Sequence, residues 1–368
     1  MAGIYIHIPF CKSRCVYCGF YSSTALDLRQ SYVEALCREI EMRGSSDPIG
    51  TIYLGGGTPS QLSMEQLSLI YDAIYKYNKV APDAEITIEV NPDDVTPDFA
   101  SALKDIPVNR VSMGAQTFDA QRLRWLHRRH TPQQVSEAVR LLRQAGIQNI
   151  SIDLMYGFPN ETLEDWNADI SQALALDVEH ISAYCLTIEE GTPLYQRLHE
   201  GTISETPEET ERTMYFTLID RLEAAGYEHY EISNFARPGF RSRHNSSYWI
   251  GTPYIGIGAA AHSYDVRTRS WNVSDIRQYI DAIQQGQRPY EEERIDTDTR
   301  YNDMVTVALR TREGLLLSSL SEAQRTHCLK NAQHYLETGL LVLSDDTLRL
   351  TREGLFVSDM IMSDLMMV

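Results

Sequence analysis

Three cysteines lie close together near the start of the chain. Cys11, Cys15 and Cys18 form a C-x3-C-x2-C run directly after the apolar segment 4–10. Thiolates are soft ligands, and three of them in one loop favour zinc or an iron–sulfur cluster. A closed zinc site would need a fourth ligand such as His7, whereas a 4Fe-4S cluster held by three cysteines would leave one iron open to another ligand. The spacing alone leaves both kinds of metal centre open.

Length, charge and cysteine usage narrow the function classes. The 368 residues carry 33 Lys and Arg against 51 Asp and Glu, and this net charge of −18 repels polyphosphate, so nucleic acid is not expected as a partner. Six cysteines are too few for a disulfide framework, and Cys37, Cys185 and Cys328 are expected to be packing residues. The sequence contains no signal peptide and no apolar run near the roughly 18–20 residues of a membrane span, so we expect a cytoplasmic protein.

The first half of the chain alternates β-branched segments with helical ones, which is typical of βα units and a parallel sheet. Six units predict an α/β fold, a partial parallel (βα)6 barrel with its site at the carboxyl ends of the strands. Capping signals such as Ser63-x-x-Gln66, Thr131-Pro132 and Thr206-Pro207 indicate helix starts between the strands. The expected strands lie near residues 3–8, 51–54, 85–90, 109–113, 149–154 and 179–184.

Alternation within two of these strands indicates which side chains face the barrel interior. In segment 85–90 the apolar residues share one face and Glu89 lies on the other, and Asp153 is opposed to its neighbours in the same way within 150–154. If the apolar faces meet the helices, both carboxylates point into the barrel. The alternative, that they lie in solvent at strand ends, stays open at this point.

Three regions are expected along the chain. Residues 1–190 form the partial barrel, residues 191–290 extend it, and residues 291–368 form a small helical domain. Within the last region, segments 340–343 and 348–350 predict a hairpin before a final helix, an order typical of a winged helix. The C-terminal region is therefore expected to be α+β.

The cysteine run, with an aromatic residue before its last cysteine and a Gly-Gly-Gly-Thr-Pro segment at 55–59 after one strand, resembles the radical S-adenosylmethionine (SAM) superfamily. The resemblance implies that Cys11, Cys15 and Cys18 hold a 4Fe-4S cluster and that SAM chelates the fourth iron. It also implies that the glycines let the backbone approach the methionine part of SAM, where a Cβ would obstruct it.

Segments 5–11, 88–92, 112–118 and 152–159 resemble the oxygen-independent coproporphyrinogen oxidase family and its relatives, the HemW-type haem chaperones. This resemblance spans about residues 4–265. The residues that it implies as SAM contacts are Tyr5, Tyr17, Gly56, Gly57, Thr58, Glu89, Gln116, Arg128 and Asp153.

Two departures separate the oxidase from the chaperone branch. The oxidase has a further cysteine where this chain has Phe20, and it carries a long N-terminal extension where only ten residues precede Cys11. The chaperone branch is marked by a His-Asn-x-x-Tyr-Trp motif associated with haem. That motif occurs here as His244, Asn245, Tyr248 and Trp249.

The motif has a chemical rationale as a haem site. An imidazole can ligate haem iron and aromatic rings can cover the porphyrin face, with Arg241 and Arg243 available for the propionates. The alternative is a satisfied core histidine, His244, whose neighbours Tyr248 and Trp249 pack a domain junction.

We therefore expect a haem chaperone with a 4Fe-4S cluster, SAM and haem as cofactors, which passes haem to acceptor proteins such as respiratory haem proteins. The alternative is an oxygen-independent coproporphyrinogen III oxidase or another tetrapyrrole-directed radical SAM oxidoreductase. Whether SAM is cleaved, and hence whether the protein is an enzyme, stays open at this point. With no membrane span expected, any membrane association would be peripheral, through partners.

Overall fold

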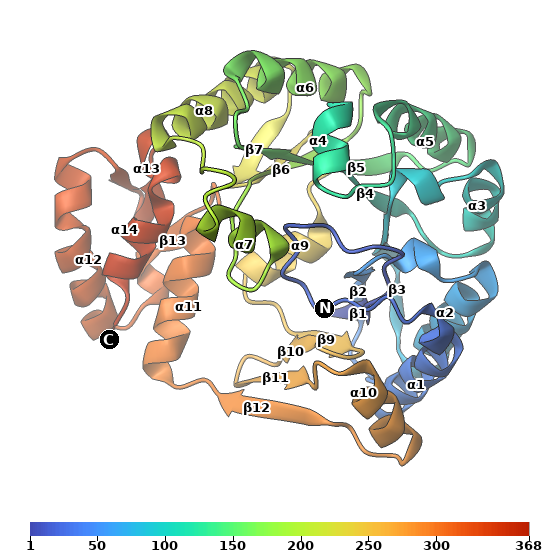
Figure 1. The fold of residues 1–368 in the computed structure, drawn as a ribbon. Helices are drawn as coiled ribbons and strands as arrows, with labels where there is room; N and C mark the ends of the chain where they lie inside the picture. The colour runs from blue at the N-terminus through green and yellow to red at the C-terminus, as the bar shows by residue number, and fades with distance from the viewer. Residues whose placement is uncertain (368) are drawn as a thin grey trace.

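Six parallel strands alternate with helices along the first half of the chain, as the sequence predicts. The computed structural model describes residues 1–367 and places these strands side by side in chain order, each parallel to the next. They are β1 (Ala2–Ile8), β2 (Ile49–Gly56), β3 (Val80–Val90), β4 (Arg110–Gln116), β5 (Asn149–Tyr156) and β6 (His180–Cys185). The predicted partial parallel barrel is confirmed (Figure 1).

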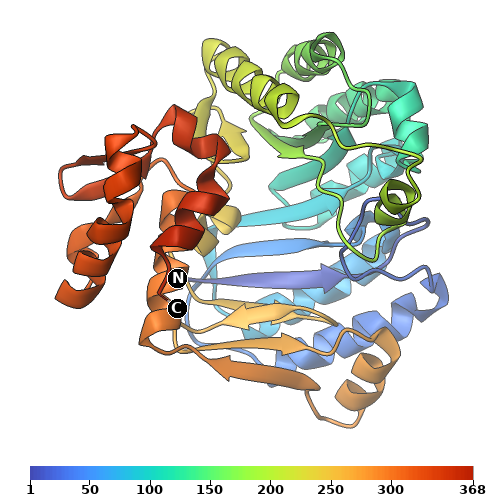
Figure 2. The same cartoon turned by 60° about the vertical axis from the view of Figure 1, so that its left-hand side comes forward.

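Helices cover the outer face of these strands (Figures 1 and 2). The capping signals at Ser63–Gln66 and Thr131–Gln134 form reciprocal capping boxes. Thr206 does not cap, because its hydroxyl donates to the carbonyl oxygens of Gly157 and Phe158. The helices of this half are α1 (Arg29–Met42), α2 (Met64–Tyr77), α3 (Pro97–Ala102), α4 (Ala120–Trp125), α5 (Pro132–Gln144), α6 (Leu163–Ala175), α7 (Pro193–His199) and α8 (Glu208–Ala224).

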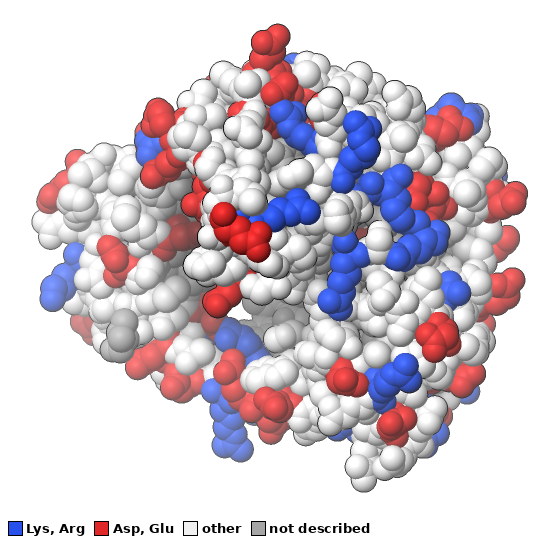
Figure 3. All heavy atoms as spheres, viewed as in Figure 1, with Lys and Arg blue, Asp and Glu red and all other residues white. Residues whose placement is uncertain are grey.

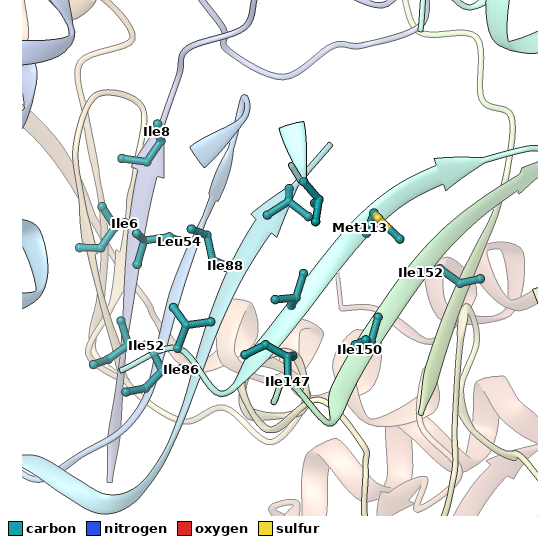
Figure 4. Packing of buried hydrophobic residues seen from close by; sticks show 14 of the residues in the cluster. Ile6, Ile8, Ile52, Leu54, Ile86, Ile88, Met113, Ile147, Ile150 and Ile152 are labelled. Carbon is teal, nitrogen blue, oxygen red and sulfur yellow. The ribbon is translucent and has the colours of Figure 1, made fainter. Parts of the chain in front are cut away.

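The main core lies between the strands and this helix layer. Alternate residues of each strand, such as Ile52 of β2 and Ile86 and Ile88 of β3, form one buried cluster with helix residues such as Leu36 and Ile70 (Figure 4). Because neighbouring residues of a strand face opposite ways, the residues between these isoleucines face the interior of the barrel.

The sheet continues beyond the six parallel strands on both sides. Next to β6 lie two antiparallel strands, and next to β1 lie one parallel and three antiparallel strands, which gives a mixed sheet of twelve. These added strands are β7 (Glu228–Glu231), β8 (Asn234–Ala236), β9 (Tyr254–Ile257), β10 (His262–Tyr264), β11 (Thr268–Asn272) and β12 (Tyr290–Arg294). The helices among them are α9 (Arg243–Trp249) and α10 (Ile276–Gln284).

The last part of the chain has a core of its own, around Tyr301, Leu309 and Leu348. Its three-stranded antiparallel sheet contains the predicted hairpin, whose turn residues Asp345 and Asp346 both have positive φ, as a two-residue type I′ turn requires. The elements are α11 (Thr297–Leu309), β13 (Leu315–Leu316), α12 (Glu322–Glu337), β14 (Leu341–Ser344), β15 (Thr347–Leu350), α13 (Arg352–Phe356) and α14 (Ser358–Leu365). Within residues 1–367, none of the helices combines the length and the apolar character that a membrane crossing requires.

Candidate functional site

The loop after β1 and the carboxyl ends of the parallel strands enclose a cavity of about 480 Å³. Cys11, Cys15 and Cys18 all line it, so the three cysteines that the sequence singles out share one site. The loop, dark blue in Figure 1, lies in front of the strands in that view. In the same view, Lys and Arg side chains gather beside a hollow, although the whole chain has a net charge of −18 (Figure 3).

All three cysteines are free thiols. The Cys11 Sγ lies 3.7 Å from the Thr58 Oγ1, and an Arg128 guanidinium N–H donates to the Cys15 Sγ at 3.7 Å. Burial raises the pKa of the Cys11 and Cys18 thiols. Binding of a soft metal centre would therefore displace protons from these thiols, since thiolates are the ligating form.

The arrangement favours a cluster over a single zinc ion. Within the described residues, no three His, Cys, Asp or Glu side chains lie close enough together to hold one metal ion. His7 does not serve as the fourth ligand, because its Nε2 donates to the Tyr21 carbonyl and its Nδ1 lies 3.1 Å from the Tyr5 hydroxyl. A four-iron cluster is larger than one ion and needs ligands that stand further apart, which suits three cysteines around one cavity.

Gly56 and Gly57 line the cavity, and their own packing requires that they lack a Cβ. Gly56 has φ +110°, and a Cβ there would lie 2.5 Å from the His7 ring. A Cβ on Gly57 would lie 2.7 Å from the Pro9 carbonyl carbon. The glycines thus let the end of β2 pack directly against the strand that leads into the cysteine loop.

Two carboxylates face the cavity from the interior side of the strands, as strand alternation predicts. Glu89 accepts hydrogen bonds from the Tyr53 hydroxyl at 2.7 Å and from the Gly56 amide at 3.1 Å. Burial raises the pKa of Glu89 to about 7 and that of Asp153 to about 6, although hydrogen bonds to both carboxylates act in the opposite direction. A cation in the cavity would favour their ionised forms.

Arg128 and Gln116 complete the wall near Cys15. One Arg128 nitrogen donates to the Asn91 side-chain oxygen at 2.8 Å and to the Gly114 carbonyl at 2.7 Å. Gln116 has φ +65°, a left-handed conformation that costs energy for a residue with a Cβ. This conformation turns the chain at the carboxyl end of β4, at the cavity wall.

Eight of the nine residues implied as SAM contacts line this cavity, including Tyr17 and Thr58. Tyr5 is the exception, because its ring stacks on Tyr53 and His244 with centroid distances of 6.2 and 6.5 Å. Several other lining residues were not singled out by sequence analysis, and one of them, Cys185, was assigned to packing. Its position at the end of β6, where parallel strands present site residues, was the available signal.

The His-Asn-x-x-Tyr-Trp motif forms α9, away from this cavity. The His244 side chain is 1% exposed, with Nδ1 2.8 Å from the Thr51 hydroxyl and Nε2 2.8 Å from the Tyr248 hydroxyl. Burial lowers the pKa of His244 to about 3, so the ring is neutral. Both ring nitrogens are engaged in this structure, as in the core-histidine alternative, and a haem iron would have to displace one of the two hydroxyls to reach the ring.

The other members of the motif lie on α9 itself. The Asn245 backbone N–H donates to the hydroxyl oxygen of Ser242, which caps α9, and the Tyr248 ring meets the Tyr254 ring edge-on with a centroid distance of 4.7 Å. The Trp249 ring lies under the Arg310 guanidinium at 4.7 Å and so connects α9 to the C-terminal region.

The two arginines expected to receive propionates are held by carboxylates. Arg241 forms ion pairs with Glu228 at 3.2 Å and with Glu313 at 2.8 Å, and Arg243 lies 3.6 Å from Asp83. Glu313 and Asp83 lie far from these arginines in sequence, so sequence analysis could not reveal that both guanidiniums are paired with carboxylates in this structure.

Comparison with known proteins identifies the family. The Radical SAM superfamily matches residues 5–173, and the HemN C-terminal domain matches residues 295–357. The heme chaperone HemW of Bacillus subtilis is 38% identical over 332 residues, covering 88% of this chain and 86% of the relative. The chain belongs to the HemW family of radical SAM proteins. A HemW relative from Mycobacterium tuberculosis (strain H37Rv) is 34% identical over 373 residues, covering 99% of this chain and 94% of the relative.

Among solved structures, the coproporphyrinogen III oxidase HemN from Escherichia coli, described as a radical SAM enzyme, superposes with a TM-score of 0.86. It covers 99% of this chain and 90% of its own at 22% identity, so the likeness shows that the HemW-family chain has the HemN fold.

Membership of the radical SAM superfamily implies a 4Fe-4S cluster and SAM. The cavity fits both groups, because the groups that line it include the thiols of the cysteine run, the buried carboxylates of Glu89 and Asp153 and the guanidinium of Arg128.

Proposed function

We propose that this chain is a cytoplasmic haem chaperone that binds haem and transfers it to acceptor proteins such as respiratory haem proteins. The observation that carries the proposal is similarity along most of the chain, C-terminal region included, to relatives named heme chaperone HemW. Acceptors would meet the chain directly, and any contact with a membrane would run through them.

In this proposal Cys11, Cys15 and Cys18 hold a 4Fe-4S cluster, and SAM coordinates its fourth iron. The cysteines support it by lining one cavity without forming a single-ion site within the described residues. The guanidinium of Arg128 beside Cys15 offsets the negative charge that thiolates and sulfides bring.

SAM would contact the remaining cavity residues. Its ammonium and sulfonium groups are cationic, and the buried carboxylates of Glu89 and Asp153 offer the opposite charge. Gly56 already donates its amide to Glu89, which fixes the carboxylate at the end of β2. When bound, the reduced cluster supplies an electron for cleavage of SAM in this superfamily, while these residues orient SAM and shield it from water.

The oxidase alternative is supported by the shared fold and by the match of residues 295–357 to the HemN C-terminal domain. Phe20 stands where the oxidase branch has a cysteine, and its side chain is 76% exposed at the cavity mouth. It offers an apolar surface and no thiol there.

The proposal is tested by following haem and coproporphyrinogen in parallel under anaerobic conditions. Cluster-reconstituted protein carrying haem is mixed with the apo-form of a b-type cytochrome, and the acceptor's absorption spectrum is recorded. We expect haem to move to the cytochrome, and we expect coproporphyrinogen with SAM and reductant to stay unchanged. Conversion of coproporphyrinogen to protoporphyrinogen, with formation of 5′-deoxyadenosine, would instead establish the oxidase.

A further inference from the structure

A second cavity, of about 370 Å³, lies where the barrel meets the C-terminal region. Its walls come from α8 and β7 on the barrel side and from the end of α11, β15 and α13 on the other. Figure 2 shows the C-terminal elements, in orange and red, beside the yellow-green α8. The volume falls in the range of small-molecule sites.

Positive charge dominates this cavity. Four arginines line it, and the acidic lining residues are Glu223 and Glu231. Two of the arginines are paired, since Arg310 lies 3.3 Å from Glu231 and Arg352 lies 2.7 Å from Asp220. The chain as a whole has a net charge of −18, so four guanidinium groups around one cavity make a local positive charge that is opposite in sign to the charge of the whole protein.

The other two arginines are Arg312 and Arg349. Neither forms an ion pair with a carboxylate anywhere in residues 1–367, and the Arg349 guanidinium bonds only a hydroxyl, that of Ser344, at 3.1 Å. Guanidinium groups present donors in a planar fork that matches a carboxylate. Two such groups at one cavity suit a ligand with two carboxylates.

Part of the cavity wall is apolar, because Ile219, Leu350 and Leu355 line it beside the charged and polar residues. A ligand that satisfies the whole surface therefore combines an apolar body with anionic groups at one edge. Free phosphate or a small dicarboxylate would satisfy the arginines and leave this apolar wall uncovered.

The motif helix reaches this cavity through one contact. The Trp249 ring supports the Arg310 guanidinium from below, and the Nε of Arg310 is buried without a hydrogen-bond partner. The first cavity, by contrast, is lined by the residues that suit the cluster and SAM. Arg310 thus connects the His-Asn-x-x-Tyr-Trp motif to the second cavity.

We propose that this second cavity binds a tetrapyrrole through its two propionate groups, with Arg312 and Arg349 as the carboxylate-binding residues and Trp249 as a positioning residue for Arg310. The inference rests on the proposed function and deepens it, because it assigns a place to the haem cargo. Recognition runs through the carboxylates, so the central iron is not required for binding at this cavity.

The test compares three ligands on the full-length, cluster-reconstituted protein. Haem, iron-free protoporphyrin IX and protoporphyrin IX dimethyl ester are titrated anaerobically, and binding is followed by absorbance or porphyrin fluorescence. We expect the iron-free porphyrin to bind about as tightly as haem. We expect the ester, which lacks ionised carboxylates, to bind roughly ten- to a hundredfold more weakly, because each lost bond involves a charged group.

The variants Arg312→Gln and Arg349→Gln should each weaken protoporphyrin IX binding by about tenfold or more, with the cluster's absorbance unchanged. Arg300→Gln is the matched control, because it removes the same charge from an exposed position on α11 outside the cavity lining. It should leave binding unchanged. Excess inorganic phosphate should compete poorly in the unmodified protein.

The results of these titrations distinguish failure of the second-cavity site from failure of the proposed chaperone function. Wild-type affinity for haem in both Gln variants, together with tight binding of the ester, would overturn this site and leave the proposed chaperone function standing. Absence of saturable binding of any porphyrin to the unmodified protein would overturn both. If Arg300→Gln weakened porphyrin binding as much as the two cavity variants do, the weaker binding would reflect the overall charge of the chain, and the proposed site would also be overturned.

Discussion

Replacement of Gly56 by Ala tests the packing that joins the cysteine loop to the barrel. The new Cβ would lie 2.5 Å from the His7 ring, and φ at this position is +110°, a conformation that an alanine adopts only with strain. The His7 ring is buried and both its nitrogens are hydrogen-bonded, so it cannot turn aside without breaking those bonds.

Two costs add at Gly56. The positive φ costs an alanine about 1–2 kcal/mol, and the forced displacement of the buried ring costs about 1–3 kcal/mol. Gly56→Ala should therefore lower the free energy of unfolding by about 2–5 kcal/mol. The measurement is guanidinium denaturation of the reduced, metal-free protein, followed by circular dichroism.

Gly146 provides the matched control. Its φ is +94°, but a Cβ there would meet no atom within 4 Å, so Gly146→Ala carries the backbone cost alone. The steric cost can also be isolated with His7→Ala, because Gly56→Ala made in that background should cost no more than Gly146→Ala. If Gly56→Ala and Gly146→Ala lower stability equally in the unmodified background, the close packing against His7 is refuted.

Three further changes probe the site and the motif helix. Burial raises the pKa of Glu89 from 4.5 to about 7, so at intermediate pH the folded state binds a proton that the unfolded state lacks. The stability that the protonated Glu89 contributes is fully present below pH 4.5 and is lost as the pH rises through about 7, by at most about 3 kcal/mol. In Glu89→Gln, a plot of the free energy of unfolding against pH should therefore be flatter over this range. Parallel plots for the variant and the unmodified protein would contradict this prediction. Cys15→Ala should abolish the visible absorbance of the reconstituted cluster while Cys37→Ala keeps it, and full iron and sulfide in the first variant would show that the ligands are wrong. His244→Ala should lower the free energy of unfolding by about 2–4 kcal/mol, because the buried Thr51 hydroxyl and the half-buried Tyr248 hydroxyl lose their partner. An unchanged denaturation midpoint would contradict a structural role.

Local sequence signals were sufficient for the barrel and for most of the first cavity. Alternation within segment 85–90 places Glu89 inside, and the cysteine run needs only one loop to bring three thiols together. The added strands β7–β12 were missed because they have three to five residues each, too few for a clear periodic pattern.

Long-range contacts account for what the sequence could not predict. His244 and its partner Thr51 are 193 residues apart, so no local pattern reveals that both ring nitrogens are satisfied. Arg241 is held in the same way by Glu313, which is 72 residues away in sequence. The second cavity combines side chains from position 219 to position 355, and only the packing of the C-terminal region on the barrel creates it.

The central claim is that this chain carries haem, and an anaerobic haem titration of the cluster-reconstituted protein tests it most directly. The Soret band is followed to saturation, and iron and sulfide are assayed before and after. The account predicts saturable binding near one haem per chain with the cluster intact. Featureless, non-saturating absorbance, or haem binding only at the expense of the cluster, would contradict it.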